Sequence, residues 1–200
     1  MKLQKALFVG LWVGLGLHLQ AQVATLRQQI QGIVAATDGT LGIAILDLDS
    51  KDSLTFHNTQ HFPMQSVFKF HLGLAVLHGV DQGRWKLDQE ILITKKDLLP
   101  NTWSPLRDKY PEGNVKLPLR DILKFTVADS DNNGCDILFR LVGGPQQVEK
   151  YLRSIGIKEV AIATDEAEMH RDDKAQYRNW STPWAAVQLM QKFYQKKFHI

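Results

Sequence analysis

The segment from Ser66 to Gly83 places the strongest constraint on the fold of this chain. Its sequence, SVFKFHLGLAVLHGVDQG, has apolar residues on most faces of a helix and ends at a glycine, a residue that stops helices. A helix that is hydrophobic nearly all round must be buried by neighbouring elements. We therefore predict a helix here that lies in the interior of the fold.

Several other segments predict helices and a hairpin around this one. Apolar residues recur at helical spacing between residue 24 and Gly39, and again in LPLRDILKFTVADSD, NNGCDILFRLVGG, PQQVEKYLRSIG and TPWAAVQLMQKFYQKKF. TLGIAILDLDS and SLTFHN alternate like two short strands joined by a turn. Prolines and a glycine divide residues 85–117 into loops and short segments. Residues 160–180 are polar, aperiodic and long for a connection, which indicates a functional Ω-type loop.

The first residues have the pattern of a secretory signal peptide. Lys2 and Lys5 precede an apolar run from Ala6 to Leu19, and Ala21 is a small residue at a cleavage position. A membrane anchor is the alternative, but a spanning helix needs about 20 apolar residues and this run is shorter. We predict a signal peptide over residues 1–21, a domain over residues 22–200, and a periplasmic protein without stable membrane insertion. The single cysteine, Cys135, can form no internal disulfide.

Composition excludes two classes of protein. A chain with 44% hydrophobic and 22% charged residues is globular, so disorder is not a serious candidate. The net charge of +3 includes both lysines of the signal segment, so the rest of the chain is close to neutral and no nucleic-acid partner is implied.

Ser66 and Lys69 are the first candidate catalytic residues. Residues three positions apart lie on one face of a helix, so the hydroxyl and the amine would be neighbours at the helix N-terminus. A partly desolvated lysine can act as the base that activates a serine nucleophile. The ordinary alternative is a serine N-cap beside a solvated lysine, and the spacing alone favours that alternative.

Two further stretches carry polar groups that could face the same cleft. Ser130-Asp131-Asn132 connects two predicted helices, although a plain turn or N-cap would use the same residue types. Glu166 and His170 lie in TDEAEMHRDD inside the long loop, where a solvated acidic loop is the ordinary alternative.

Taken together, Ser66-Val67-Phe68-Lys69, Ser130-Asp131-Asn132 and Glu166 make the chain resemble a class A serine β-lactamase. KKDLLPNTWSP, SDNNGCD and Glu166-Ala167-Glu168-Met169-His170 are most similar to the PER-type extended-spectrum branch. The resemblance implies an α+β fold of the β-lactamase and transpeptidase type, in which a mostly helical part accompanies an antiparallel sheet flanked by helices.

The resemblance also implies a role for each motif residue. Ser66 attacks the lactam carbonyl and becomes acylated, while Lys69, Glu166 or both, through a water, take its proton. Ser130 relays a proton toward the leaving nitrogen. Asn132 hydrogen-bonds Lys69 and the substrate's side-chain amide, and Glu166 activates the water that hydrolyses the acyl-enzyme.

Three positions bear on the shape of the cleft. Trp103 would form a wall of the substrate entrance, with simple packing as the alternative. His170 stands where the family usually has an Asn that holds the hydrolytic water, and imidazole can also position a water. Asp136 likewise replaces a usual Asn. The two exchanges imply a loop folded differently and a wider cleft that tolerates bulky cephalosporin side chains.

The family's third motif, Lys-Thr-Gly on an inner strand, does not occur in this sequence. We therefore expect the chain to be an N-terminal fragment whose fold is incomplete at the C-terminus. That strand would supply the cation for the substrate carboxylate and one oxyanion-hole donor, and loss of one such donor costs on the order of 100-fold in rate. We expect the 200 residues alone to be inactive and the full-length protein to be active.

The alternatives to a hydrolase are a penicillin-binding peptidase or transpeptidase of the same fold, and a non-enzymatic cell-wall binder or degenerate remnant. A long loop carrying Glu166 favours the hydrolase. No metal site is expected, because the histidines show no H-x-H or H-E-x-x-H spacing, and no cofactor is needed, because hydrolysis uses only water. The expected partners are penicillins and cephalosporins, and the expected state is a monomer.

Overall fold

The computed structural model describes residues 23–195 and divides the chain into two compact units, with the boundary between Asn58 and Thr59. The predicted signal peptide, residues 1–21, lies outside the described residues. No helix within residues 23–195 is long and apolar enough to cross a membrane.

The first unit contains a helix and a hairpin, as predicted. Residues 23–36 are helical. Strand β1 (Ile43–Leu46) pairs antiparallel with β2 (Ser53–Phe56), and Ile43 lies opposite Phe56. The Asp47 carboxylate stabilises the turn between the strands, because it accepts hydrogen bonds from the backbone N–H groups of Asp49 and Ser50.

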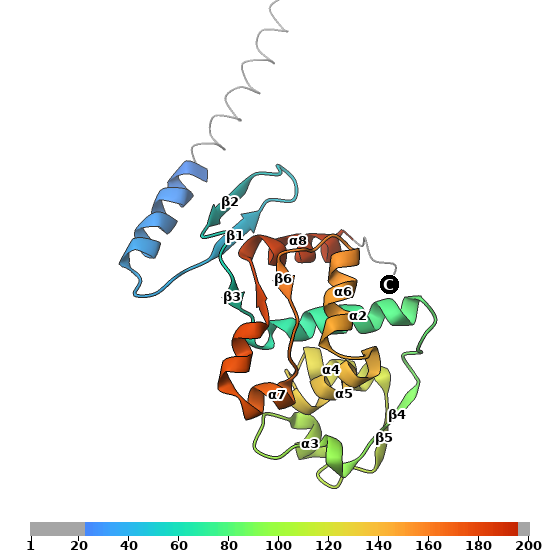
Figure 1. Ribbon diagram of the computed structural model, residues 1–200. Helices are drawn as coiled ribbons and strands as arrows, with labels where there is room; N and C mark the ends of the chain where they lie inside the picture. The colour runs from blue at the N-terminus through green and yellow to red at the C-terminus, as the bar shows by residue number, and fades with distance from the viewer. Residues whose placement is uncertain (1–22, 196–200) are drawn as a thin grey trace, which may run out of the picture. The chain divides into compact units, whose positions relative to one another are not determined.

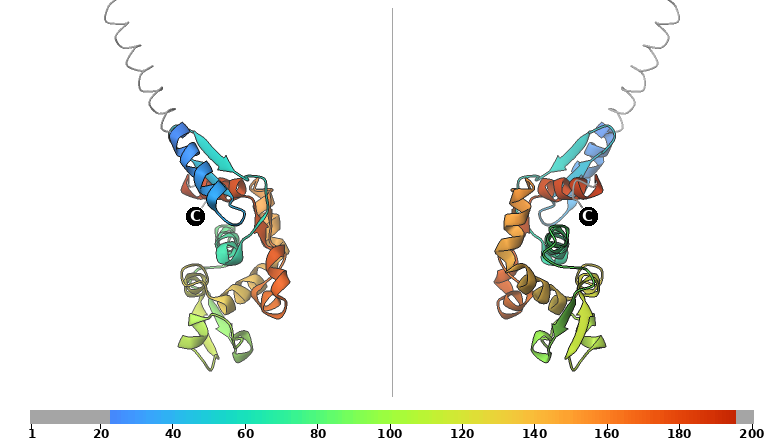
Figure 2. Two further views of the ribbon diagram at one scale, coloured as in Figure 1. Left: turned by 90° about the vertical axis from the view of Figure 1, so that its left-hand side faces the viewer. Right: turned by 90° about the vertical axis from the view of Figure 1, so that its right-hand side faces the viewer.

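The second unit is built around the buried helix that the sequence predicts. This helix, α2 (Phe68–Asp81), packs against α4 (Leu119–Val127), α5 (Asn132–Val142) and α6 (Pro145–Ser154) (Figure 1). Figure 2 views α2 nearly end-on with α6 beside it. Phe68 and Leu72 are fully buried. At Gly79 a Cβ would lie 1.9 Å from the Trp85 ring, so only glycine lets the ring approach the helix this closely.

The start of this helix differs from the prediction. Ser66 does not open α2 but lies in η1 (Gln65–Val67), a 3₁₀ turn that leads directly into it. Such turns are frequent at helix N-termini, because their tighter winding satisfies groups that a regular first turn leaves unpaired. Ser66 therefore remains at the positive end of the α2 dipole.

Residues 85–117 contain more regular structure than the prolines suggested. Strands β4 (Glu90–Ile93) and β5 (Val115–Pro118) pair antiparallel, and η2 (Lys95–Asp97) and α3 (Pro105–Lys109) lie between them in sequence. The last element, α8 (Pro183–Tyr194), begins at an N-cap in which the Thr182 side chain accepts from Ala185 N–H, in the segment predicted as a helix.

The long loop closes on itself. Strand β6 (Val160–Ala161) at its start pairs antiparallel with β7 (Trp180–Ser181) at its end, and β3 (Phe62–Pro63) pairs with the other side of β7. The two ends of the loop therefore meet, which confirms the Ω-type prediction. Two short helices that the aperiodic sequence did not predict, α7 (Glu166–Arg171) and η3 (Asp173–Arg178), fill the loop.

Candidate active site

Ser66 of η1 and Lys69 in the first turn of α2 are neighbours, as their spacing predicts. Lys69 Nζ lies 3.1 Å from Ser66 Oγ. Ser66 is exposed, whereas the Lys69 side chain is only 2% exposed because α2 is buried on this side. An accessible hydroxyl beside a desolvated amine is the arrangement that serine nucleophiles with a lysine base require.

Lys69 is the residue on which the other candidates converge. Its Nζ lies 2.8 Å from Glu166 Oε1, 2.5 Å from Asn132 Oδ1, 2.8 Å from the Ser130 carbonyl oxygen and 3.3 Å from Ser130 Oγ. These groups come from α2, from the α4–α5 connection with the first residue of α5, and from the long loop, so the fold brings together all three motifs.

An unusual backbone conformation directs Ser130 toward Lys69. Ser130 has a φ of 57°, a left-handed value that residues with a Cβ adopt rarely and at an energetic cost. This turn between α4 and α5 presents both the carbonyl and the hydroxyl of Ser130 to the same ammonium. Left-handed residues of this kind persist where the surrounding structure over-determines them, often at active sites.

The surrounding structure at this turn is the carboxylate of Asp131, to which the sequence analysis gave no role. Asp131 is fully buried and accepts from Ser104 Oγ, Gly134 N–H and Leu106 N–H, at 3.0, 2.7 and 2.6 Å. It therefore caps α5 and holds the first turn of α3 with one side chain. An Asp side chain is rarely buried unless it is paired. The position of Asp131 between Ser130 and Asn132 is the one sequence feature that points to a structural role for it.

Asn132 is oriented from both ends of its amide. Its Oδ1 accepts from Lys69, and its Nδ2 donates to Thr102 Oγ1 at 2.7 Å. The Thr102 carbonyl in turn accepts from Arg107 Nη1 at 2.8 Å. Thr102 is a second positioning residue that the sequence did not reveal, because it lies far from any motif.

Glu166 reaches the site from the first residue of α7. The Asp165 side chain caps this helix by accepting from Glu168 N–H at 2.8 Å, and the Glu166 N–H donates to Asp136 Oδ1 at 2.9 Å. The Glu166 side chain is 13% exposed. Its position is thus set by Asp136 of α5 through the backbone and by Lys69 of α2 through the carboxylate.

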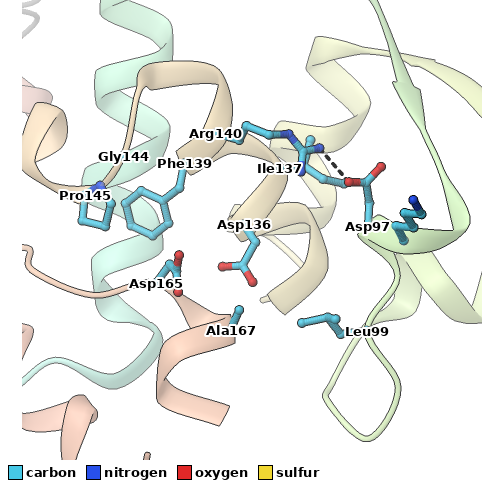
Figure 3. A pocket seen from close by; sticks show the side chains of 11 residues that line it. Asp97, Leu99, Asp136, Ile137, Phe139, Arg140, Gly144, Pro145, Asp165 and Ala167 are labelled. Atoms are coloured by element: carbon cyan, nitrogen blue, oxygen red, sulfur yellow. Dashed lines mark ion pairs between the residues drawn. The ribbon is translucent and has the colours of Figure 1, made fainter. Parts of the chain in front are cut away.

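Asp136 sits in an environment that disfavours its negative charge. Burial and the neighbouring Asp165 carboxylate together raise the pKa of the Asp136 carboxyl to about 7, although the hydrogen bond from the Glu166 N–H acts in the opposite direction. Figure 3 shows both carboxylates in one cavity of about 380 Å³, which also contains the ion pair between Arg140 and Asp97.

The uncharged side chain of Asn179 joins the two ends of the long loop. Asn179 is fully buried, and its Oδ1 accepts from Ala163 N–H at 2.8 Å and Thr164 N–H at 3.1 Å, while its Nδ2 donates to the Thr164 carbonyl at 2.9 Å. The Asn179 carbonyl accepts from Met64 N–H at 2.9 Å, two residues before Ser66. Asn179 therefore joins the two ends of the loop through its side chain and contacts the segment before Ser66 through its backbone.

The two remaining predicted residues lie at the surface. The Trp103 ring is 63% exposed and its Nε1 donates to the Asp129 carbonyl at 2.9 Å, so it does not pack into the core. His170 is exposed in α7. No contact brings either side chain to Ser66 in the described structure, and their roles toward a substrate stay predictions.

A pocket of about 250 Å³ opens directly onto Ser66, the candidate nucleophile. We call it the nucleophile pocket, and the following residues line it: Gln65, Ser66, Asn132, Glu166, Met169, Asp173 and Gln176. Across residues 23–195, no three His, Cys, Asp or Glu side chains are grouped so that they could hold a metal ion.

Comparison with known proteins identifies relatives of this chain. Residues 25–199 match the model of the Beta-lactamase enzyme family. The chain is 42% identical over 176 residues to "Extended-spectrum beta-lactamase PER-1" of Pseudomonas aeruginosa, covering 88% of this chain and 57% of that protein. It is 42% identical over 180 residues to "Beta-lactamase VEB-1" of the same organism, covering 90% and 60%.

Solved structures agree with these relatives. The crystal structure of a beta-lactamase from Chitinophaga pinensis superimposes with a TM-score of 0.84 at 50% identity, over 86% of this chain and 63% of that one. TLA-1 extended-spectrum beta-lactamase superimposes with a TM-score of 0.85 at 46% identity, over 87% and 63%. The predicted α+β class and fold type are confirmed. The chain spans less than two thirds of the length of each of these four relatives.

Proposed function

This chain belongs to the beta-lactamase enzyme family, and we propose that the whole protein hydrolyses β-lactam antibiotics through an acyl-enzyme on Ser66, and so confers resistance to them. One observation carries the proposal. The exposed Ser66 hydroxyl lies 3.1 Å from Lys69 Nζ, which lies 2.8 Å from the Glu166 carboxylate, so nucleophile, amine and carboxylate form one continuous proton path.

Acylation uses this path. Ser66 Oγ attacks the lactam carbonyl carbon, the C–N bond of the ring breaks and an ester forms. A lysine ammonium has no lone pair, so Lys69 accepts the hydroxyl proton only after it has lost one of its own, and transfer to Glu166 is one route for that loss. The 2.8 Å separation between Nζ and Oε1 allows that transfer directly.

Ser130 delivers the proton that the leaving nitrogen needs. Its Oγ lies 3.3 Å from Lys69 Nζ, so it can receive a proton from the amine while giving its own to the nitrogen. Without this protonation the nitrogen would leave as an unstable anion and the ring would reclose.

Deacylation uses Glu166 as a general base. A water in the nucleophile pocket loses its proton to the carboxylate and attacks the ester carbonyl. The C–O bond to Ser66 breaks, the Ser66 oxygen takes up a proton while Glu166 gives up the one it received, and the ring-opened acid departs. Glu166 lines the same pocket as Ser66, which supports this assignment.

The test is mass spectrometry of protein expressed from the complete reading frame and mixed with a chromogenic cephalosporin. We expect turnover by the wild type, accumulation of an acyl adduct on Ser66 in Glu166→Gln with deacylation slowed on the order of 10²- to 10⁴-fold, and no adduct in Ser66→Ala. A lasting adduct on the wild type would indicate the penicillin-binding peptidase instead. Absence of both turnover and adduct would overturn the proposal.

We also propose that the protein acts in the periplasm as a monomer, after removal of residues 1–21. The support is the basic and apolar pattern of those residues and the small residue at position 21. Cell fractionation with intact-mass measurement tests it, since an unprocessed cytoplasmic protein contradicts export. Light scattering of the purified protein tests the oligomeric state.

A further inference from the structure

The side chains of Gln65 and Gln176 form a bridge between the turn of the nucleophile and the long loop. Gln65 Nε2 donates a hydrogen bond to Gln176 Oε1, and Gln176 Nε2 donates to the Asp173 carbonyl at 2.6 Å. Gln176 therefore orients the amide of Gln65, and the Asp173 carbonyl orients the amide of Gln176. We call Gln65 and Gln176 the amide strap.

The strap begins at a residue under conformational constraint. Gln65 has a φ of 47°, in the left-handed region, and Ser66 follows it directly. Residues other than Gly, Asn and Asp rarely adopt this backbone conformation, so the surrounding structure holds Gln65 in it. A change in the bond between Gln65 and Gln176 thus acts on the residue next to the nucleophile.

The strap also forms part of the wall of the nucleophile pocket, together with Asp173. Gln65 and Gln176 line this pocket beside Ser66 and Glu166, so a part of a ligand that enters the pocket meets the strap.

Building on the proposed function, we propose that the amide strap determines specificity by selecting the size of the acyl side chain that the enzyme accepts. A compact side chain fits beneath the closed strap. A bulky one, such as an oxyimino group, requires the bond between Gln65 and Gln176 to open. Opening one hydrogen bond of this kind disfavours the bulky substrate by roughly two- to tenfold.

The experiment is a double-mutant cycle on substrate selectivity in the protein expressed from its complete reading frame. The variants are Gln176→Ala, Gln65→Asn and the double variant, because Asn tolerates the left-handed backbone but is too short to reach Gln176. The measured quantity is kcat/KM for an oxyimino-cephalosporin divided by kcat/KM for benzylpenicillin. Gln146→Ala, an exposed glutamine in α6, is the matched control.

We expect the ratio to rise roughly two- to tenfold in Gln176→Ala and also to rise in Gln65→Asn. The double variant should match Gln176→Ala, because the bond is lost only once, and Gln146→Ala should match the wild type. If the ratio is unchanged in both single variants, or if the two substitutions change it additively, the proposed role of the amide strap is wrong. Loss of hydrolysis of both substrates already in the wild type would instead contradict the proposed function.

Discussion

Lys69 and Glu166 form an ion pair in which Nζ lies 2.8 Å from Oε1, with side chains 2% and 13% exposed. Lys69 Nζ also lies within hydrogen-bonding distance of Ser66 Oγ, Ser130 O, Ser130 Oγ and Asn132 Oδ1. An ammonium has three protons, so it cannot satisfy all of these acceptors at once. Lys69 therefore has more acceptors within reach than protons to donate, which is consistent with the proton transfers proposed above.

Replacing Lys69 tests whether this amine is needed for the first chemical step. In Lys69→Gln we expect the acylation rate to fall on the order of 10²- to 10⁴-fold, because the amide cannot accept the Ser66 proton. Stopped-flow measurement of the acylation phase with a chromogenic cephalosporin gives the rate. Lys124→Gln, an exposed lysine of α4, serves as the control. Unchanged acylation in Lys69→Gln would leave Glu166 as the sole base.

Replacing Asp131 tests its structural role in joining α3 to α5. In the wild type the Asp131 carboxylate accepts hydrogen bonds from Gly134 N–H and Leu106 N–H. In Asp131→Asn the side-chain NH₂ replaces one of the two oxygens, so one of these N–H donors faces another donor. We expect a loss of about 2–4 kcal/mol in the free energy of unfolding, because charge-assisted buried bonds are the strong ones. Urea denaturation measures it. Asp129→Asn, an exposed carboxylate two positions earlier, should change stability by less than about 0.5 kcal/mol.

The sequence predicts well where a signal is local. The helical spacing in residues 117–154 and 182–194, the hairpin of β1 and β2, and the pairing of Ser66 with Lys69 all follow from residues close together in the chain. The buried helix α2 is also predicted, because a helix with so many apolar faces has no stable exposed form.

What escaped prediction depends on contacts between distant residues. Strands β4 and β5 are separated by more than twenty residues that include η2 and α3, so neither strand segment by itself indicates its partner. Thr102, Asp131 and Asn179 act through hydrogen bonds to groups that only the fold brings near. Helix α7 exists because Asp165 caps it and Asp136 holds its first N–H, neither of which a periodicity analysis detects.

Replacing Asn179 tests the side-chain hydrogen bonds that join the two ends of the long loop. In Asn179→Asp one oxygen can still accept from Ala163 N–H, but the other oxygen faces the Thr164 carbonyl that now accepts from Nδ2. Two acceptors in contact without a proton repel each other in a buried site. We expect the loop over residues 160–180 to be cleaved faster by a protease.

The same variant should slow deacylation more than acylation, because Glu166 is carried by the loop and Ser66 is not. Limited proteolysis and single-turnover kinetics give the two readouts. Asn114→Asp makes the same chemical change at an exposed residue outside the loop. Equal protease sensitivity in the two variants would contradict the role assigned to Asn179.

Replacing Asp136 tests the charge balance behind Glu166 through its pH dependence. The native pKa of about 7 lies above the ordinary value of 3.8, so the folded protein binds this proton more tightly than the unfolded chain. The stability gained from that proton is fully present below pH 3.8 and is lost as the pH rises through 7. Asp136→Asn carries no titrating group, and its Oδ1 can still accept from the Glu166 N–H.

The difference in unfolding free energy between Asp136→Asn and the wild type should therefore shift in favour of the variant as the pH rises from 4 to 8. Because the side chain is partly accessible to solvent, we expect a shift of about 1–3 kcal/mol. Urea denaturation at intervals of pH measures it, and Asp88→Asn, an exposed carboxylate, reports the effect of removing one surface charge. If the difference in unfolding free energy stays constant between pH 4 and 8, then the folded protein does not raise the pKa of Asp136. Burial and the nearby Asp165 carboxylate would then not disfavour its charge.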